Sequence, residues 1–575
     1  MTPPPLSDLP LEVISVGRIQ VDLYGEQIGG SLEDMRSFVK LLGGAPANIA
    51  VGASRLGLRV GMISRVGDEQ MGRFVLRSLE REKVDTRGVV RDAGRLTSLA
   101  LLGIRDSSTF PLLYYRENCA DAALSVDDID PSYIASAQAV VVTGTLCANP
   151  VTEAACHEIL RLARLHDTMV VLDIDFRPVL WGLTAIDQGE SRFVSSRRVT
   201  DALRCLVASC DVIVGTEEEF QIAGGVENLV DALQIVRSAS AATLVVKLGA
   251  EGCVVFEGEI GRDRAAWNIV AGFPVDVVNV LGAGDAFLAG LLRGRLRGEG
   301  WTASCTYANA CGAIVVTRNS CAPATPSFDE LRLFLDSGRT ASRQFAQDAD
   351  FARLHRHSVT GTTAQTNAVV RLPDGFSLAT GLTGEAAIHK IRQLIGVELD
   401  LAGIAILSPT DLLGLVPGGT WCGVRLDDAA INRLAGRAYE RLNTYPADHH
   451  MIVALDQTLL PSAETSPLGE IRNACTATGR DLLVELPCGE GDPTELVSAV
   501  YAYGIKPDWW LVPASLEEQT AAALVSSITA ADPLCLGMIV DITGVNGPAA
   551  RERLQKLCAS TRLRVVPLAP LSVVG

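Results

Sequence analysis

The residues whose types and spacing most clearly suggest chemistry are Gly282, Ala283, Gly284 and Asp285, between an apolar run and an apolar helical pattern. Small residues at a helix N-terminus let its backbone N–H groups close on an anion. A carboxylate in that turn would repel an anion. The carboxylate is explained if Asp285 takes a proton from a substrate hydroxyl while the backbone amides bind a phosphoryl group during its transfer. The pattern therefore predicts a kinase that acts on a small molecule.

A second glycine-rich turn, at residues 43–57 (GGAPANIAVGASRLG), is expected to bind the acceptor of that reaction. Gly43 and Gly44 let the backbone approach a ligand closely, and the Asn48 amide can both donate to and accept from hydroxyls. The alternative is a tight turn that opens a helix packed on a sheet. Asp22 is expected at the C-terminal edge of the first strand, where substrates are usually held, or else as a turn aspartate.

Two arginines are candidates for binding an acidic group of the substrate. Arg116 closes a lid-like segment (YYREN), and Arg177 follows a buried strand (DFRP). A guanidinium at each strand end suits bidentate binding of a carboxylate or a phosphate. The alternative is that both form ordinary surface ion pairs.

Residues on the nucleotide side follow two further strands. Thr216 and Glu219 come after VIVG, where an acidic group could hold hydrated Mg²⁺; equally, Thr216 could cap a helix that has Glu219 in its first turn. Lys247 ends the next strand. The glycines behind it, Gly249 and Gly252, would let the phosphate or ribose of a nucleotide come close to the backbone.

The elements that must position these residues alternate between short β-rich runs and helical patterns. Buried parallel strands are expected at residues 13–17, 140–146, 170–175, 212–216 and 243–249. Helices are expected between them, for example at 153–165 and 217–237. The alternation predicts an α/β sandwich with ligands at the C-terminal strand edges, and the alternating segment 96–115 predicts a small antiparallel lid sheet.

The second half of the chain shows a different organisation. A polar linker with a short helix is expected at 337–365, between a first domain at 11–336 and a second at 366–575. Eight further β-runs, with helical patterns between most of them, favour a (β/α)8-like barrel. They lie at residues 367–372, 404–408, 423–427, 451–456, 482–486, 509–513, 537–542 and 563–568.

Bulk composition narrows the classes of partner. The 575 residues carry a net charge of −17, which argues against nucleic acid and anionic membranes as partners. The first residues, MTPPPLSDLPLE, do not resemble a signal peptide, and no apolar run is long enough to span a membrane. The 14 cysteines are scattered without metal-ligand spacing, so we expect reduced thiols in a cytoplasmic protein.

The two glycine-rich turns resemble the two signatures of the ribokinase-like (PfkB) carbohydrate kinases. Further segments, among them DLYGEQIGGSLEDMRSF, SRVGDEQMGRF, FPLLYYRENCADAAL and VLDIDFRPVLWGL, follow one another as in the branch that phosphorylates 5-dehydro-2-deoxy-D-gluconate in myo-inositol catabolism. The resemblance covers residues 11–335 and implies transfer from Mg-ATP to the 6-hydroxyl of this sugar acid. It also implies a homo-oligomer, and it leaves a monovalent cation open. Asn309, in YANACGA on a small-residue helix, is expected near the adenine.

Other functions remain open at this stage. The YR and FR segments are similarly placed in 2-dehydro-3-deoxygluconate kinases, so that acid or another sugar is an alternative substrate. A non-enzymatic sensor that binds a sugar acid is a further alternative. Asp285 argues against it, because a sensor needs no base beside an anion site.

The C-terminal region resembles the aldolase-like DUF2090 domain fused to such kinases, through YGIKPDWW at residues 503–510. There a lysine normally follows the two tryptophans and is the Schiff-base candidate of a class I aldolase. Here that position is Leu511. Two hypotheses follow: a barrel kept as a structural or oligomerisation module, which we favour, or a divergent lyase that makes the chain a bifunctional kinase and phosphoaldolase.

Overall fold

The computed structural model divides into two compact units, residues 1–355 and 356–575. In the first part of the chain the structure describes residues 10–359 except 28, 107–108, 187 and 190–192. Beyond it the described residues are 368–371, 404–409, 422–426, 431, 438, 442, 449–454, 466–487, 492–513, 515–541, 547–561 and 563–570.

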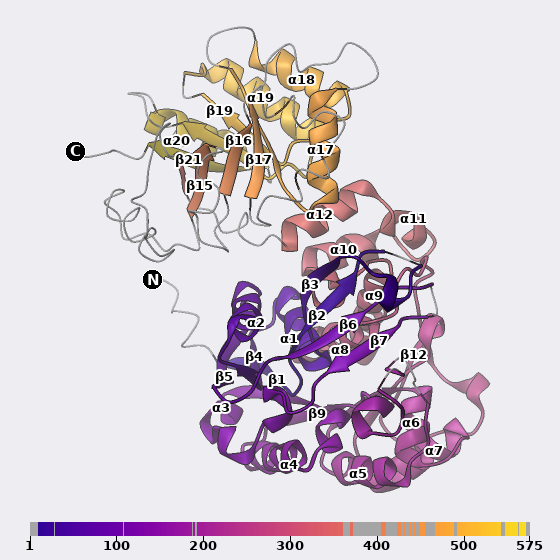
Figure 1. The fold of residues 1–575 in the computed structure, drawn as a ribbon. Helices are drawn as coiled ribbons and strands as arrows, with labels where there is room; N and C mark the ends of the chain where they lie inside the picture. The colour runs from indigo at the N-terminus through magenta and orange to yellow at the C-terminus, as the bar shows by residue number, and fades with distance from the viewer. Residues whose placement is uncertain are drawn as a thin grey trace. The chain divides into compact units, whose positions relative to one another are not determined.

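The first unit is built on a nine-stranded sheet of order β13-β12-β11-β10-β9-β8-β1-β4-β5 (Figure 1). Its strands are β1 (Leu11–Val16), β4 (Val60–Gly67), β5 (Asp85–Asp92), β8 (Ala137–Thr143), β9 (Met169–Asp173), β10 (Val212–Thr216), β11 (Thr243–Lys247), β12 (Gly252–Phe256) and β13 (Ile269–Ala271). All pair in parallel except at β12 and β13. The five strands expected in this unit are present, and the four missed strands lie at the two edges.

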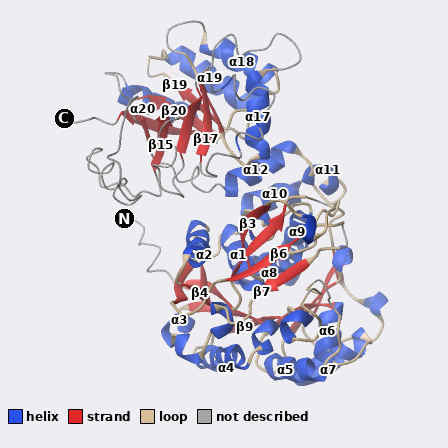
Figure 2. Ribbon diagram, viewed as in Figure 1, coloured by secondary structure: helices blue, strands red, loops and turns tan. Residues whose placement is uncertain are grey.

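Helices cover both faces of this sheet (Figure 2), because successive side chains of the buried strands point to opposite faces. Val13 belongs to one apolar core and Ile14 to the other. The first core is closed by α1 (Ala45–Arg55), α2 (Gln70–Arg81), α8 (Ala283–Leu296), α9 (Trp301–Val316) and α10 (Phe328–Asp336). The second is closed by α3 (Pro131–Ala135), α4 (Pro150–Leu165), α5 (Arg197–Val207), α6 (Glu217–Gly224) and α7 (Leu229–Ala239).

A separate four-stranded sheet of order β3-β2-β6-β7 forms the lid. Its strands are β2 (Gln20–Gly25), β3 (Phe38–Gly43), β6 (Ser98–Leu102) and β7 (Leu112–Tyr115). Only β6 and β7 were foreseen, and β2 pairs with β6 in parallel. Asp22 therefore lies within a lid strand, opposite Leu41 and Ala100, and the expectation of a position at the edge of the main sheet was wrong.

Helix α8 is packed closely on two sides. A Cβ added to Gly52 would lie 2.8 Å from Ala289 Cβ on α8. A Cβ added to Gly290 would lie 2.8 Å from the Cα of Ala308 on α9. These glycines let helix backbones approach more closely than larger residues would allow.

Two other expectations need correction. The helical stretch at 217–237 is two helices, because Gly225 adopts a left-handed φ of 69° and ends α6. The expected linker contains two helices, α11 (Ser342–Ala346) and α12 (Ala349–Val359), and the boundary between the units falls within α12. Phe345 and Phe351 pack with Phe334 of α10, which explains why this polar segment is helical. None of the described helices is both long and apolar enough to cross a membrane.

In the second unit, eight strands pair in parallel in chain order, and β14 pairs with β21 to close the sheet. They are β14 (Ala368–Arg371), β15 (Ile404–Pro409), β16 (Cys422–Leu426), β17 (His449–Ala454), β18 (Leu482–Glu485), β19 (Trp509–Val512), β20 (Gly537–Asp541) and β21 (Arg564–Pro570). Helices α17 (Pro467–Ala477), α18 (Pro493–Ala502), α19 (Glu518–Ala531) and α20 (Gly547–Cys558) follow four of them.

Candidate active site

The two glycine-rich turns meet at the N-termini of α1 and α8. Asp285 lies in the first turn of α8, which begins after Gly282 in a left-handed conformation (φ 80°). Asn48, in the first turn of α1, donates from Nδ2 to Asp285 Oδ2 at 2.7 Å. Its Oδ1 atom is buried without a hydrogen-bond partner, so it can accept from a substrate hydroxyl.

Lys247 faces the same turn from the end of β11. Its Nζ lies 3.3 Å from Asp173 Oδ1 and 3.6 Å from Glu219 Oε2. A Cβ added to Gly284 would lie 3.3 Å from this ammonium group. The positive end of the α8 dipole and the lysine charge thus favour an anion at one place, next to Asp285.

Arginines line the side of the site nearest to the lid. Arg177 Nε lies 3.2 Å from Asp175 Oδ1, and Arg18 Nη2 lies 3.2 Å from the other oxygen of the same carboxylate. Arg116 is held differently, because its Nε donates to Asp121 Oδ2 at 2.7 Å. The structure therefore brings Arg177 together with Arg18, a residue that the sequence did not single out, whereas Arg116 has its own acidic partner.

Asp22 closes the site from the lid strand β2. Gln20 Nε2 donates to Asp22 Oδ1 at 2.7 Å. A Cβ added to Gly43 would lie 2.0 Å from the Asp22 carboxyl carbon, and one added to Gly44 would lie 2.6 Å from the backbone oxygen of Arg18. Both glycines are required because the chain from Arg18 to Asp22 runs this close to the turn before α1.

Burial sets the protonation of the acidic groups in the site. It raises the pKa of Asp285 to about 6, against the opposing effect of the hydrogen bond from Asn48. It also raises the pKa of Asp22 and that of Asp173 to about 7. At Asp175 the charges of Arg18 and Arg177 outweigh burial and hold the pKa below its usual value. Asp285 is thus a stronger proton acceptor than an ordinary aspartate and is still ionised near neutral pH.

Thr216 and Glu219, which were predicted on the nucleotide side, are hydrogen-bonded to each other. Thr216 and Glu219 form the capping box of α6: Glu219 N–H donates to Thr216 Oγ1 at 3.2 Å, and Thr216 N–H to Glu219 Oε2 at 2.7 Å. The N–H of Phe176 donates to Glu219 Oε1 at 3.3 Å. Because both oxygens of Glu219 are already engaged, this carboxylate suits a Mg²⁺ ion that keeps its waters.

The remaining predicted positions lie around β12. Gly249 has a φ of 59°, and a Cβ there would meet nothing within 4 Å, which leaves room for a ligand. Gly252 is required by packing, because its Cβ would lie 2.0 Å from Val270 O. Asn309 Nδ2 donates to the same carbonyl at 2.8 Å, so its amide ties α9 to β13, and a contact with adenine stays a prediction.

Three residues of the site were missed from the sequence: Arg18, Asp173 and Asp175. Each lies at or just beyond the C-terminal end of a central strand, β1 or β9. That position was the available signal, since parallel strands present their C-terminal ends at one edge. Asp175 carries a second signal in the structure, a left-handed φ of 36° in a residue other than glycine.

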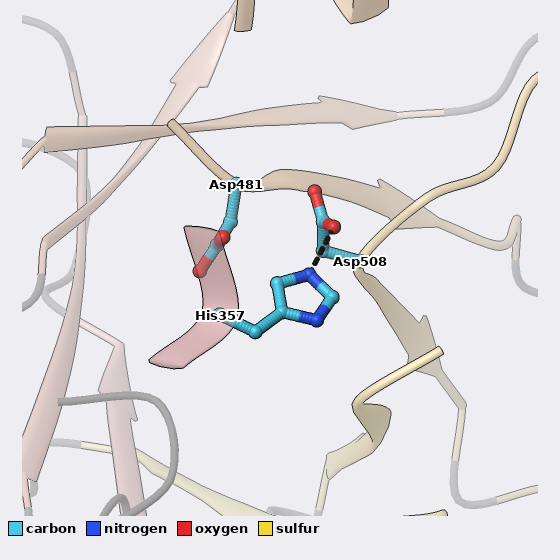
Figure 3. Close-up of side chains that lie close together, drawn as sticks. All are labelled: His357, Asp481 and Asp508. Carbon is cyan, nitrogen blue, oxygen red and sulfur yellow. Dashed lines mark hydrogen bonds and ion pairs between the residues drawn. The ribbon is translucent and has the colours of Figure 1, made fainter. Parts of the chain in front are cut away.

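A second cluster of titratable groups lies within the C-terminal unit. His357, Asp481 and Asp508 form the group of metal-ligand type found among the described residues (Figure 3). Asp508 also accepts from Arg356 Nη2 at 2.5 Å and from Arg472 Nη1 at 3.1 Å. Both aspartates directly precede strands, β18 and β19, at the end of a barrel associated with stability. Two guanidiniums on one carboxylate make this a structural ion-pair cluster and disfavour a cation.

Comparison with known proteins agrees with this geometry. Residues 11–327 match the pfkB family carbohydrate kinase model, and residues 441–566 match that of an uncharacterized protein conserved in bacteria (DUF2090). The chain is 34% identical to a 5-dehydro-2-deoxygluconokinase of Geobacillus kaustophilus over 339 residues, 58% of this chain and 96% of that protein. It is 32% identical to one of Listeria innocua over 338 residues, 57% of this chain and 97% of that protein.

A solved structure of a PfkB protein from Polaromonas sp. JS666 is also similar. It is 30% identical with a TM-score of 0.48, over 56% of this chain and 99% of that chain. The family match spans more than half of the 575 residues, and the curated relatives are matched over nearly their whole length. This chain belongs to the pfkB family of carbohydrate kinases and is a phosphotransferase that acts on an alcohol group.

Proposed function

We propose that this chain transfers the γ-phosphoryl group of ATP to the 6-hydroxyl of 5-dehydro-2-deoxy-D-gluconate. The observation that carries the proposal is the meeting of Asp285 with the N-terminus of α8 and Lys247. A base and an anion site side by side are what phosphoryl transfer to a hydroxyl needs. The names of the curated relatives support the choice of substrate.

The mechanism follows from the positions of these groups. Asn48 and Asp22 hold the acceptor so that its hydroxyl lies against Asp285. The proton passes to the Asp285 carboxylate as the hydroxyl oxygen bonds to the γ-phosphorus and the bond from phosphorus to the β-phosphate oxygen breaks. The N–H groups of Ala283 and Gly284, with Lys247, stabilise the charge on the phosphoryl oxygens.

ATP is expected along the ends of β10 and β11. Gly249 leaves open space there for the phosphates or ribose, and Lys247 meets them at the α8 turn. Glu219 and Asp173 would hold Mg²⁺ through its waters. The ion, when bound, offsets the charge that ATP brings to the site. The lid strands exclude water, which limits transfer of the phosphoryl group to water.

For the C-terminal unit we infer a structural or oligomerisation role without catalysis. Leu511, at the position of the expected Schiff-base lysine, is only 3% exposed. It belongs to a separate apolar cluster with Ile452, Leu483, Trp509, Ile539 and Val566. An amine at this position would be surrounded by hydrocarbon, and leucine offers no nucleophile for a carbonyl group.

An ADP-release assay tests the substrate. With Mg-ATP, we expect turnover of 5-dehydro-2-deoxygluconate and little turnover of 2-dehydro-3-deoxygluconate, ribose, fructose or adenosine. Preference for the second acid would keep the mechanism and change the substrate. ATP binding without turnover of any compound would instead support a sensor.

Substitution of the base tests the mechanism. Asp285→Asn keeps the shape of the side chain but cannot take the proton, so kcat should fall ~10²–10⁴-fold while KM changes little. Steady-state kinetics on the preferred substrate measure both. The exposed Arg161→Gln on α4 is the control, since its partner Glu158 lies on the same helix. A near-normal kcat for Asp285→Asn would contradict the assignment.

The pH profile tests the protonation of Asp285. Because the base acts ionised and burial raises its pKa to about 6, kcat/KM should fall about tenfold per pH unit below that value. Asn48→Ala removes a hydrogen bond that favours the ionised form, so the acid limb should move to higher pH. The limb should persist in Asp22→Asn. Its loss there would assign the titration to Asp22 instead.

Borohydride trapping tests the C-terminal unit. The intact protein is incubated with its kinase product and sodium borohydride, and its mass is measured. We expect no adduct, because Leu511 cannot form an imine, whereas a class I aldolase treated in parallel with its own substrate gains one. A stoichiometric adduct on the C-terminal unit would establish a lyase instead.

A further inference from the structure

Two guanidinium groups share one carboxylate beneath the lid. Asp175 Oδ2 lies 3.2 Å from Arg18, and Oδ1 lies 3.2 Å from Arg177. Two positive charges and one negative charge leave this set with one net positive charge. Arg116 adds nothing to that excess, because Asp121 neutralises it at 2.7 Å.

The donors of this pair are incompletely satisfied. Nε and Nη1 of Arg18 and Nη1 of Arg177 are buried without a hydrogen-bond partner, and Nε of Arg177 has its ion pair with Asp175 but no hydrogen bond. Arg18 is only 5% exposed. Buried N–H groups without acceptors are costly and rare, so several of them on neighbouring guanidiniums mark the place of an acceptor that binds from outside the chain.

The surroundings identify that place as part of the substrate site. The charge of Arg18 acts on Asp22 of the lid strand β2 and on Tyr114 of β7. The charge of Arg177 acts on Asp285. The arginine pair therefore lies close to both the lid strands and the base.

We propose that Arg18 and Arg177 together bind the carboxylate of the sugar acid and that Arg18 determines the preference for an acid over a neutral sugar. The proposal rests on the proposed function for the identity of the acid. A planar anion with a single charge matches both the geometry of two guanidiniums and their net charge. The phosphoryl group has its own anion site at Lys247 and the start of α8.

Asp175 is the positioning residue of this pair. Its Oδ2 also accepts from Thr145 Oγ1 at 3.2 Å, and its backbone is left-handed at φ 36°. A strained residue that bridges two like charges holds them close together before the substrate arrives. The excess positive charge is thus in place for the carboxylate.

The test compares the acid substrate with its primary amide, which keeps the size and removes the charge. In Arg18→Gln, we expect KM for the acid to rise on the order of 10–100-fold, with kcat changed only a few-fold because Asp285 is intact. KM for the amide should hardly change. Arg18→Lys, which keeps the charge but not the fork of donors, should recover part of the preference.

Controls separate binding from stability. Arg237→Gln is the matched control, since Arg237 is a half-buried arginine that donates only to backbone carbonyls, among them Ala242 O and Phe256 O. It should preserve the preference for the acid. Mg-ATP should raise the melting temperature of each variant as much as it raises that of the wild-type protein. If it does not do so for Arg18→Gln, the comparison is made with Arg18→Lys instead.

The outcomes distinguish the two proposals. An equal loss on acid and amide in the Arg18 variant would overturn the role of Arg18 while the substrate stands. If the wild-type protein does not phosphorylate 5-dehydro-2-deoxygluconate but phosphorylates 2-dehydro-3-deoxygluconate, the substrate assignment fails. The role of Arg18 is then tested with that second acid and its amide. A wild-type enzyme that prefers the amide would overturn both.

Discussion

Pairing of buried charges is the constraint on which this active site depends. Acidic and basic side chains crowd the C-terminal ends of the central strands under the lid, where water cannot stabilise them. Asp175 stays ionised because two guanidiniums surround it, and Lys247 stays charged between Asp173 and Glu219. Among the described residues Asp285 has no ion-pair partner and accepts a hydrogen bond from Asn48, so burial raises its pKa whereas the pKa of Asp175 falls. The surroundings thus keep Asp175 ionised as an ion-pair partner and make Asp285 a better proton acceptor.

The same pairing divides the site into two anion-binding regions. At one end, the start of α8 and Lys247 concentrate positive potential where charge moves during the reaction. At the other, Arg18 and Arg177 provide a fixed excess of one charge. Asp285, with its hydrogen bond from Asn48, lies in the first turn of α8, and the charge of Arg177 also acts on it. With the carboxylate at the arginine pair, as proposed, a sugar acid would place its hydroxyl toward the base.

The sequence identified the two glycine-rich turns of this site and some of the residues at strand ends, Arg177 and Lys247 among them. The turns at Gly43 and Gly282 were recognisable because close backbone approach leaves few residue types to choose from. Arg18 was not, because an arginine after a first strand looks like any surface arginine until β2 folds over it. Asp173 and Asp175 were counted as part of a strand. The strands β2 and β3 were missed because β2 is held by pairing with β6, a contact that the local sequence does not encode, and β3 in turn pairs with β2.

The close packing of α8 has a mechanical consequence. Gly52 on one side and Gly290 on the other let α8 pack closely against α1 and α9, so a shift of this helix would require its neighbours to move with it. The base and the amide-bearing turn are therefore stationary parts of the enzyme. Any closure around the substrate has to come from the four-stranded lid, whose strands carry Asp22 and Tyr114. In the proposed mechanism the lid would bring the acceptor to the catalytic group, which the close packing of α8 holds in place.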